Sequence, residues 1–110
     1  MPSYDSLNLR PGDRAAYAAA AAELDMDAVR QSATALVQLV LTDDYAYIDA
    51  LPDEVQDELL TPLGMLSEAL RDRVDDAILI AAIRSVRLSA QPVLAQCPDE
   101  MRELIDALPR

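Results

Sequence analysis

Residues Ala77-Ile78-Leu79-Ile80-Ala81-Ala82-Ile83 form the longest run of aliphatic residues in this chain of 110 residues. The run is far too short to span a bilayer, which needs about 20 apolar residues. Leu79, Ile80 and Ile83 make the segment apolar on nearly every side of a helix. We therefore expect either the central buried helix of a bundle or part of a homo-oligomer interface through Ala77–Ile83.

The composition around this run favours helices throughout. Hydrophobic residues make up 52% of the chain, yet Phe and Trp are absent, so Ala, Leu, Val and Ile must fill the core. Two Gly are too few for the turns of a β-sandwich or barrel. We predict an all-α fold, a compact bundle of five to seven helices, with two related helical units as a further option. Residues 1–10 are expected to be an irregular lead-in and 11–110 a single helical domain.

Helix boundaries are predicted from Pro, Asp, Ser and Thr at helix starts and from apolar spacing. Val29, Ala33, Leu36, Val37 and Val40 form one clear stripe. The predicted helices start at Pro11 with Asp13 as N-cap, at Asp25 or Asp27, at Thr42-Asp43-Asp44 with an end at Leu51, at Pro52-Asp53-Glu54, at Thr61-Pro62 with an end near residue 84, at Ser89, and at Pro98-Asp99-Glu100.

The pentapeptide Ile-Asp-Ala-Leu-Pro occurs twice, at Ile48–Pro52 and Ile105–Pro109. At the same offset, nine of 24 positions are identical between 29–52 and 86–109. A duplicated helical unit and a shared way of ending helices both explain the match. In either case Ile and Leu should face the core, Asp should point outward and Pro should stop the helix.

Charge and missing residue types exclude several functions. With 20 acidic residues, nine Arg and no Lys, the net charge is −11, which repels nucleic acids and anionic membranes. The chain has no His, a single cysteine (Cys97) and no Gly-rich phosphate loop. We therefore predict no catalytic, cofactor-binding or metal-binding residue. No signal peptide is recognised, and a soluble cytoplasmic protein is expected.

Acidic residues are segregated along the chain. Residues 31–70 contain eight acids and no base. Seven of these acids fall within 43–58: Asp43, Asp44, Asp49, Asp53, Glu54, Asp57 and Glu58. The stretch is either a solvated face or a docking surface for a basic protein partner. The Ala-rich segment 15–22 is either packed inside the bundle or a second close-approach interface.

A non-enzymatic protein-interaction module (an adaptor, an assembly component or a stoichiometric inhibitor) fits these features best. A second hypothesis is a blocker of a nucleic-acid-binding protein, of the immunity or anti-defence type, whose carboxylates imitate phosphates. A third is a magnesium-dependent hydrolase, because three carboxylate pairs resemble those of all-helical nucleotide pyrophosphohydrolases. The pairs are Glu54/Asp57, Asp72/Asp75 and Glu100/Glu103.

Overall fold

The computed structural model describes residues 3–109, and within that range the fold is an all-α bundle without strands. This confirms the predicted fold class. The elements are the 3-10 helices η1 (Ser3–Leu7) and η2 (Gln91–Gln96) and the α-helices α1 (Pro11–Ala22), α2 (Met26–Leu41), α3 (Ala46–Asp49), α4 (Asp53–Arg71), α5 (Asp76–Ala90) and α6 (Asp99–Asp106).

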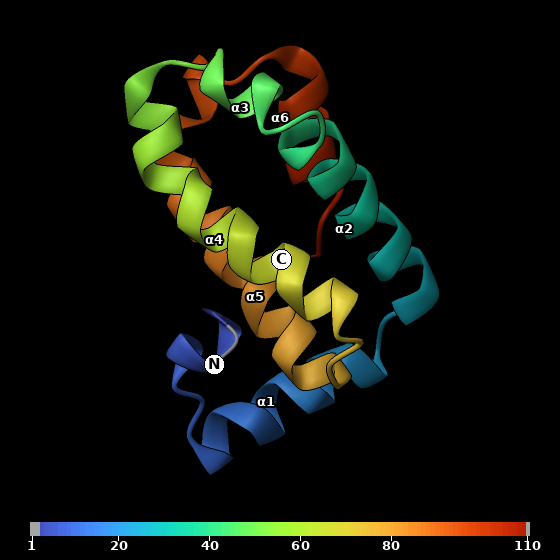
Figure 1. The fold of residues 1–110 in the computed structure, drawn as a ribbon. Helices are drawn as coiled ribbons and strands as arrows, with labels where there is room; N and C mark the ends of the chain where they lie inside the picture. Colours follow the sequence, from blue (N-terminus) through green and yellow to red (C-terminus); the bar gives the residue numbers. More distant parts are fainter. Residues whose placement is uncertain (1–2, 110) are drawn as a thin grey trace.

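Helix α5 is the centre of the bundle. It packs along α4, and α1 crosses it near its start (Figure 1). Helix α2 packs on α4 and α6, and α3 bridges α2 and α4. Figure 1 shows α3, α6 and the start of α4 at one end of the molecule, with α1 and the start of α5 at the opposite end. The fully buried large side chains come from α2 to α6 and none comes from α1: Leu36, Ile48, Leu59, Leu63, Leu66, Leu79, Ile83, Met101, Val40, Val55 and Val86.

The run Ala77–Ile83 is buried within the chain itself. Six of its residues are buried, and Ile78 is half-buried. The expectation of a central buried helix is therefore confirmed, and the side chains that an oligomer interface would need are already covered. By length and composition Asp76–Gln96 could cross a membrane, but half of its apolar window is buried in the bundle. That burial is typical of the core helix of a soluble protein.

The prediction of one long helix over about 62–84 is wrong, because the stripe belongs to two helices. Pro62 lies inside α4 and is buried. Proline removes one backbone hydrogen bond there, but the buried side chains of Leu59, Leu63 and Leu66 continue on both sides of it and hold the helix against α5. The apolar residues on each side of Pro62 therefore belong to one helix, although a proline after threonine resembles a helix start.

The break between α4 and α5 falls at residues 72–75. Arg73 has φ 51°, in the left-handed region, and its N–H donates to the carbonyl of Leu70 (3.3 Å). The Val74 N–H donates to the carbonyl of Ala69 (3.3 Å). These two bonds define a Schellman motif, with Arg73 where glycine is usual. The Asp75 carboxylate then accepts from the Ile78 N–H (3.1 Å) and caps α5.

Other helix boundaries follow the predictions with three further corrections. Asp25 caps α2, and α4 and α6 begin directly after Pro52 and Pro98, as predicted. Asp13 is not the N-cap of α1. Arg10 holds that position, and the Asp13 carboxylate accepts its N–H. Ser89 lies inside α5 rather than at a helix start, and the segment that follows Ala90 is the 3-10 helix η2. The third correction concerns residues 42–44, where the structure has a turn instead of the predicted helix start.

Both copies of Ile-Asp-Ala-Leu-Pro end a helix in the predicted way. Ile48 and Ile105 are buried, as are Leu51 and Leu108, whereas Asp49 and Asp106 are exposed. Upstream, however, the two segments differ. The first contains the uninterrupted α2, while the second contains the end of α5 and η2, so the chain changes direction near Pro92.

The lead-in is more ordered than predicted. Residues Ser3–Leu7 form η1, which packs on α4. The Ser3 N–H and hydroxyl both donate to the Glu68 carboxylate (2.6 and 2.8 Å), and these bonds lower the pKa of Glu68. The Tyr4 hydroxyl donates to Asp72 (2.9 Å). Glu68 of α4 and Asp72, the C-cap residue of α4, thus fix the start of the described chain.

Candidate protein-docking site at the acidic end

The end of the molecule formed by residues 42–60 and the first turn of α6 is called the acidic end here. It begins where α2 stops at Leu41. Asp43, Asp44 and Tyr45 follow with φ of 53°, 56° and 65°, three successive residues in the left-handed region. Backbone bonds from Tyr45 to Thr42 (3.1 Å) and from Ala46 to Asp43 (3.1 Å) hold this turn.

The left-handed turn overturns the predicted helix start at Thr42-Asp43-Asp44. Asp adopts this conformation more readily than most residues, but for tyrosine it costs about 1–2 kcal/mol. Neither Asp43 nor Asp44 caps a helix, and α3 starts only at Ala46. The turn leaves the Tyr45 side chain 51% exposed, among the acids. Sequence reasoning missed Tyr45, because only the backbone of the turn shows that it is held outward.

Helix α3 has only four residues, and it is fixed by contacts with α4. Ile48 and Leu51 are buried beneath it. The Gln56 side-chain amide donates to the carbonyls of Asp49 (3.1 Å) and Leu51 (2.7 Å), which would otherwise lack partners at the end of α3. The position of the exposed Asp49 is therefore set relative to the start of α4.

The first turns of α4 carry four of the seven predicted site residues. Asp53 and Glu54 lie in the first turn, where the positive end of the helix dipole stabilises carboxylates. Asp57 and Glu58 lie one turn later, beyond most of that effect, and both are exposed. Leu60 is 48% exposed and follows Asp53 and Asp57 at i+7 and i+3, so acids and an apolar side chain share this face.

Helix α6 adds carboxylates that the sequence analysis did not assign to the site. The Tyr47 hydroxyl of α3 donates to Glu100 (2.9 Å), and the Gln96 amide donates to Glu54 (2.7 Å). Burial and the bond to Glu100 raise the pKa of Tyr47 to about 12. These bonds join α3 to the start of α6 and the end of η2 to the start of α4, so Asp99 and Glu100 lie at the acidic end as well. The second Pro-Asp-Glu of the sequence was the signal for this, because it marks a second helix start that the fold brings beside the first.

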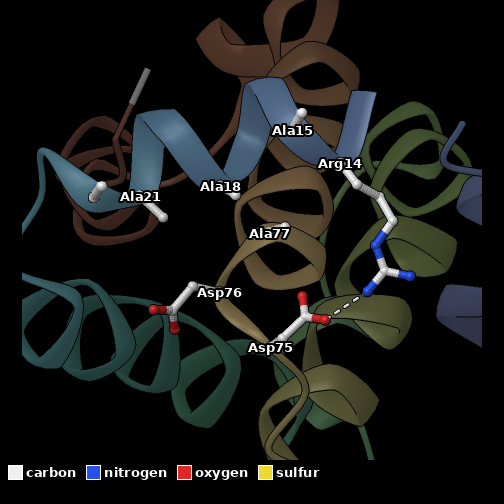
Figure 2. Close-up of a pocket in the computed structure, with 8 residues that line it drawn as sticks. Arg14, Ala15, Ala18, Ala21, Asp75, Asp76 and Ala77 are labelled. Carbon is white, nitrogen blue, oxygen red and sulfur yellow. Dashed lines mark hydrogen bonds and ion pairs between the residues drawn. The ribbon is translucent and has the colours of Figure 1, made fainter. Parts of the chain in front are cut away.

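Ion pairs distinguish the acidic end from the opposite end. At the opposite end, Arg14 pairs with Asp75 (2.6 Å; Figure 2) and Arg30 with Asp76 (3.0 Å). None of the seven acids of 43–58 forms an ion pair within residues 3–109. At the acidic end, Arg102 pairs with Asp99 within α6. The predicted site residues are thus brought to one end of the bundle, exposed and without cationic partners in the described part of the chain.

The three carboxylate pairs do not share one site. Asp72 and Asp75 lie on either side of the break between α4 and α5 rather than on one helix face, and both accept hydrogen bonds from other groups. Glu54/Asp57 lie on α4 and Glu100/Glu103 on α6, whose starts are neighbours, so only these two pairs come from adjacent helices. Within residues 3–109 no three His, Cys, Asp or Glu side chains gather in a way that could hold a metal ion. The geometry therefore offers no support for the magnesium hypothesis.

No family model, curated protein or solved structure matches this chain.

Proposed function

We propose that this chain is a non-enzymatic protein-interaction module that docks a basic partner protein with its acidic end. One observation carries the proposal: seven carboxylates within 43–58 are exposed and lack ion pairs in the described structure, while Asp75 and Asp76 at the opposite end are paired with Arg14 and Arg30. A partner rich in Arg or Lys would supply the missing cations and would be steered to this end at low salt.

Two apolar side chains make the acidic end more than a charged surface. Tyr45 is 51% exposed beside Asp43 and Asp44, and Leu60 is 48% exposed beside Asp57. Tyrosine is enriched among the residues that contribute most to protein interfaces. Because charges mainly set the rate and specificity of association, Tyr45 and Leu60 are the proposed anchors that slow dissociation.

A cytoplasmic location fits the free buried thiol of Cys97.

The test compares two triple variants with the same net charge. The site variant is Asp49→Asn, Asp57→Asn and Glu58→Gln, which takes the charge from −11 to −8. The matched control is Asp5→Asn, Glu23→Gln and Asp27→Asn, three exposed acids outside the acidic end. The partner is captured from source cells with the wild-type protein, identified and purified, and its association rate is measured by stopped flow at several salt concentrations.

The site variant should associate about tenfold more slowly at low salt and should show a flatter salt dependence. The control variant should behave like the wild-type protein. Equal effects of the two variants would show that total charge, not the acidic end, governs binding. An unchanged rate and salt response in the site variant would show that the acidic end is only a solvated face.

The class of the partner separates this proposal from the phosphate-imitating alternative. If the captured protein binds nucleic acid, duplex DNA or RNA should compete with this chain for the same basic surface. If nucleic acid and this chain compete for the partner, this chain acts as an inhibitor. If both bind the partner at the same time, it acts as an adaptor.

A further inference from the structure

One side of α5 is left uncovered by the rest of the bundle. Arg84, Leu88 and Gln91 follow one another at helical spacing and are all exposed. Leu88 has the largest exposed fraction, 54%, among the exposed large hydrophobic side chains of residues 3–109. The central helix of the fold therefore carries a surface strip that packing inside this chain does not explain.

Arg84 stands where three hollows in the surface meet. One lies between α5, Tyr17 of α1 and the segment that contains Leu7 and Leu9. A second, of about 530 Å³, lies between α5, Leu94 of η2 and Asp106 of α6. The third runs beside the alanines of α1. Arg84 and Leu88 line both of the first two hollows, and Arg84 also lines the third. The hollows on either side of these two residues are together called the α5 groove here.

The α5 groove has a local positive charge although the chain carries −11. Its charged lining residues are Arg84, Arg87 and Asp106. Arg87 is engaged within the fold, because its guanidinium donates to the carbonyls of Ile105 (2.6 Å) and Leu108 (3.1 Å) at the end of α6. Arg84 forms neither an ion pair nor a side-chain hydrogen bond within residues 3–109. In the described part of the chain the groove thus offers, among apolar side chains, a cation that has no ion pair.

We infer that the α5 groove binds an amphipathic helix of a protein partner, with apolar side chains that cover Leu88 and a carboxylate that pairs with Arg84. Arg84, Leu88 and Gln91 lie at i, i+4 and i+7, so a partner helix that lies along α5 would contact all three. Charge complementarity selects the acidic partner. A second copy of this chain fits less well, because a twofold contact centred here would bring two Arg84 side chains together. This surface shares no residue with the acidic end, so the inference goes beyond the proposed function and stands independently of it.

Two synthetic helical peptides of about four turns serve as probes. Both carry Leu at helical spacing, and they differ at one position in the middle of the apolar face, Glu in one and Lys in the other. The peptides are titrated into the labelled protein while the methyl signals of Leu88 and the Nε signal of Arg84 are followed by NMR. The Glu peptide should shift both signals. Arg84→Glu should weaken its binding about tenfold and strengthen binding of the Lys peptide.

Leu88→Ser and Leu60→Ser form a matched pair, because both leucines are about half exposed but only Leu88 lines the groove. Leu88→Ser should weaken binding of the Glu peptide and Leu60→Ser should not, with equal melting temperatures for the two variants. The inference is overturned if neither peptide shifts the Leu88 and Arg84 signals at millimolar concentration, or if the two serine variants bind alike. It is also overturned if light scattering shows a dimer that Leu88→Ser dissociates, because a second copy would then cover the groove.

Discussion

Replacing Arg73 with glycine tests the break between α4 and α5, on which the whole arrangement of the bundle depends. Arg73 is exposed, has φ 51° and forms no side-chain hydrogen bond or ion pair within residues 3–109. A left-handed conformation costs a residue with a Cβ atom about 1–2 kcal/mol, and glycine avoids that cost. Glycine also makes the unfolded chain more flexible, which offsets about 0.5–1 kcal/mol. We expect Arg73→Gly to raise the free energy of unfolding by about 0.5–1 kcal/mol and the melting temperature by about 2–5 °C.

Arg73→Ala is the control, because it removes the same side chain and keeps the Cβ atom. In the Schellman motif alanine should be about as stable as arginine and less stable than glycine. In one continuous helix over 62–84, glycine would instead be about 1 kcal/mol less stable than alanine. Urea and thermal unfolding followed by circular dichroism give both values. A glycine variant less stable than the alanine variant would refute the break and the packing of α5 that follows from it.

Two further predictions concern the core and the acidic end. Ile80→Asp should lower the free energy of unfolding by several kcal/mol, because Ile80 is only 8% exposed and its replacement would bury a carboxylate, which Arg84, one turn further along α5, would compensate only in part. Leu88→Asp, at an exposed position of the same helix, should cost little, and an unchanged melting temperature for Ile80→Asp would show that this face is not packed. The pKa of Tyr47, raised from 10.0 to about 12, favours the neutral hydroxyl in the folded state, so its contribution to stability is constant below pH 10 and is lost between about pH 10 and 12. Between pH 9 and pH 11 the urea midpoint should therefore fall less for Tyr47→Phe than for the wild-type protein. Equal decreases would contradict the raised pKa of Tyr47.

The parts of the fold that were predicted correctly are those reported by periodicity and capping. In the predicted stripe, Val29, Ala33, Leu36 and Val40 are buried and Val37 is half-buried, because apolar side chains four or three residues apart share one helix face. The starts at Pro52 and Pro98 were predicted because proline and acids suit the first turn of a helix. These rules involve only neighbouring residues, so the sequence contains all the information they need.

The errors arise where tertiary packing overrides a local signal. Pro62 resembles a helix start, but buried leucines on both sides keep it inside α4. Arg73 occupies the left-handed position at which glycine would have indicated the break. Asp43 and Asp44 resemble N-caps, yet the left-handed turn places the next helix start beyond them. The sequence located the acids of the candidate site, but the contribution of α6 and the outward position of Tyr45 depend on contacts between distant segments.

Acids at helix starts are compensated differently at the two ends of the bundle, and this difference supports a binding role for the acidic end. At the opposite end, Asp75 and Asp76 lie at the start of α5, and each pairs with an arginine from another helix. At the acidic end, α4 and α6 also start with two consecutive acids, whose negative charge is stabilised mainly by the helix dipole. Asp57 and Glu58 lie beyond the strongest effect of that dipole. Folding can therefore proceed without cations at either end, since exposed ion pairs contribute only about 0–1 kcal/mol. Stability alone gives no reason for arginines to be present at one end and absent among residues 31–70, whereas a basic partner that provides the cations does.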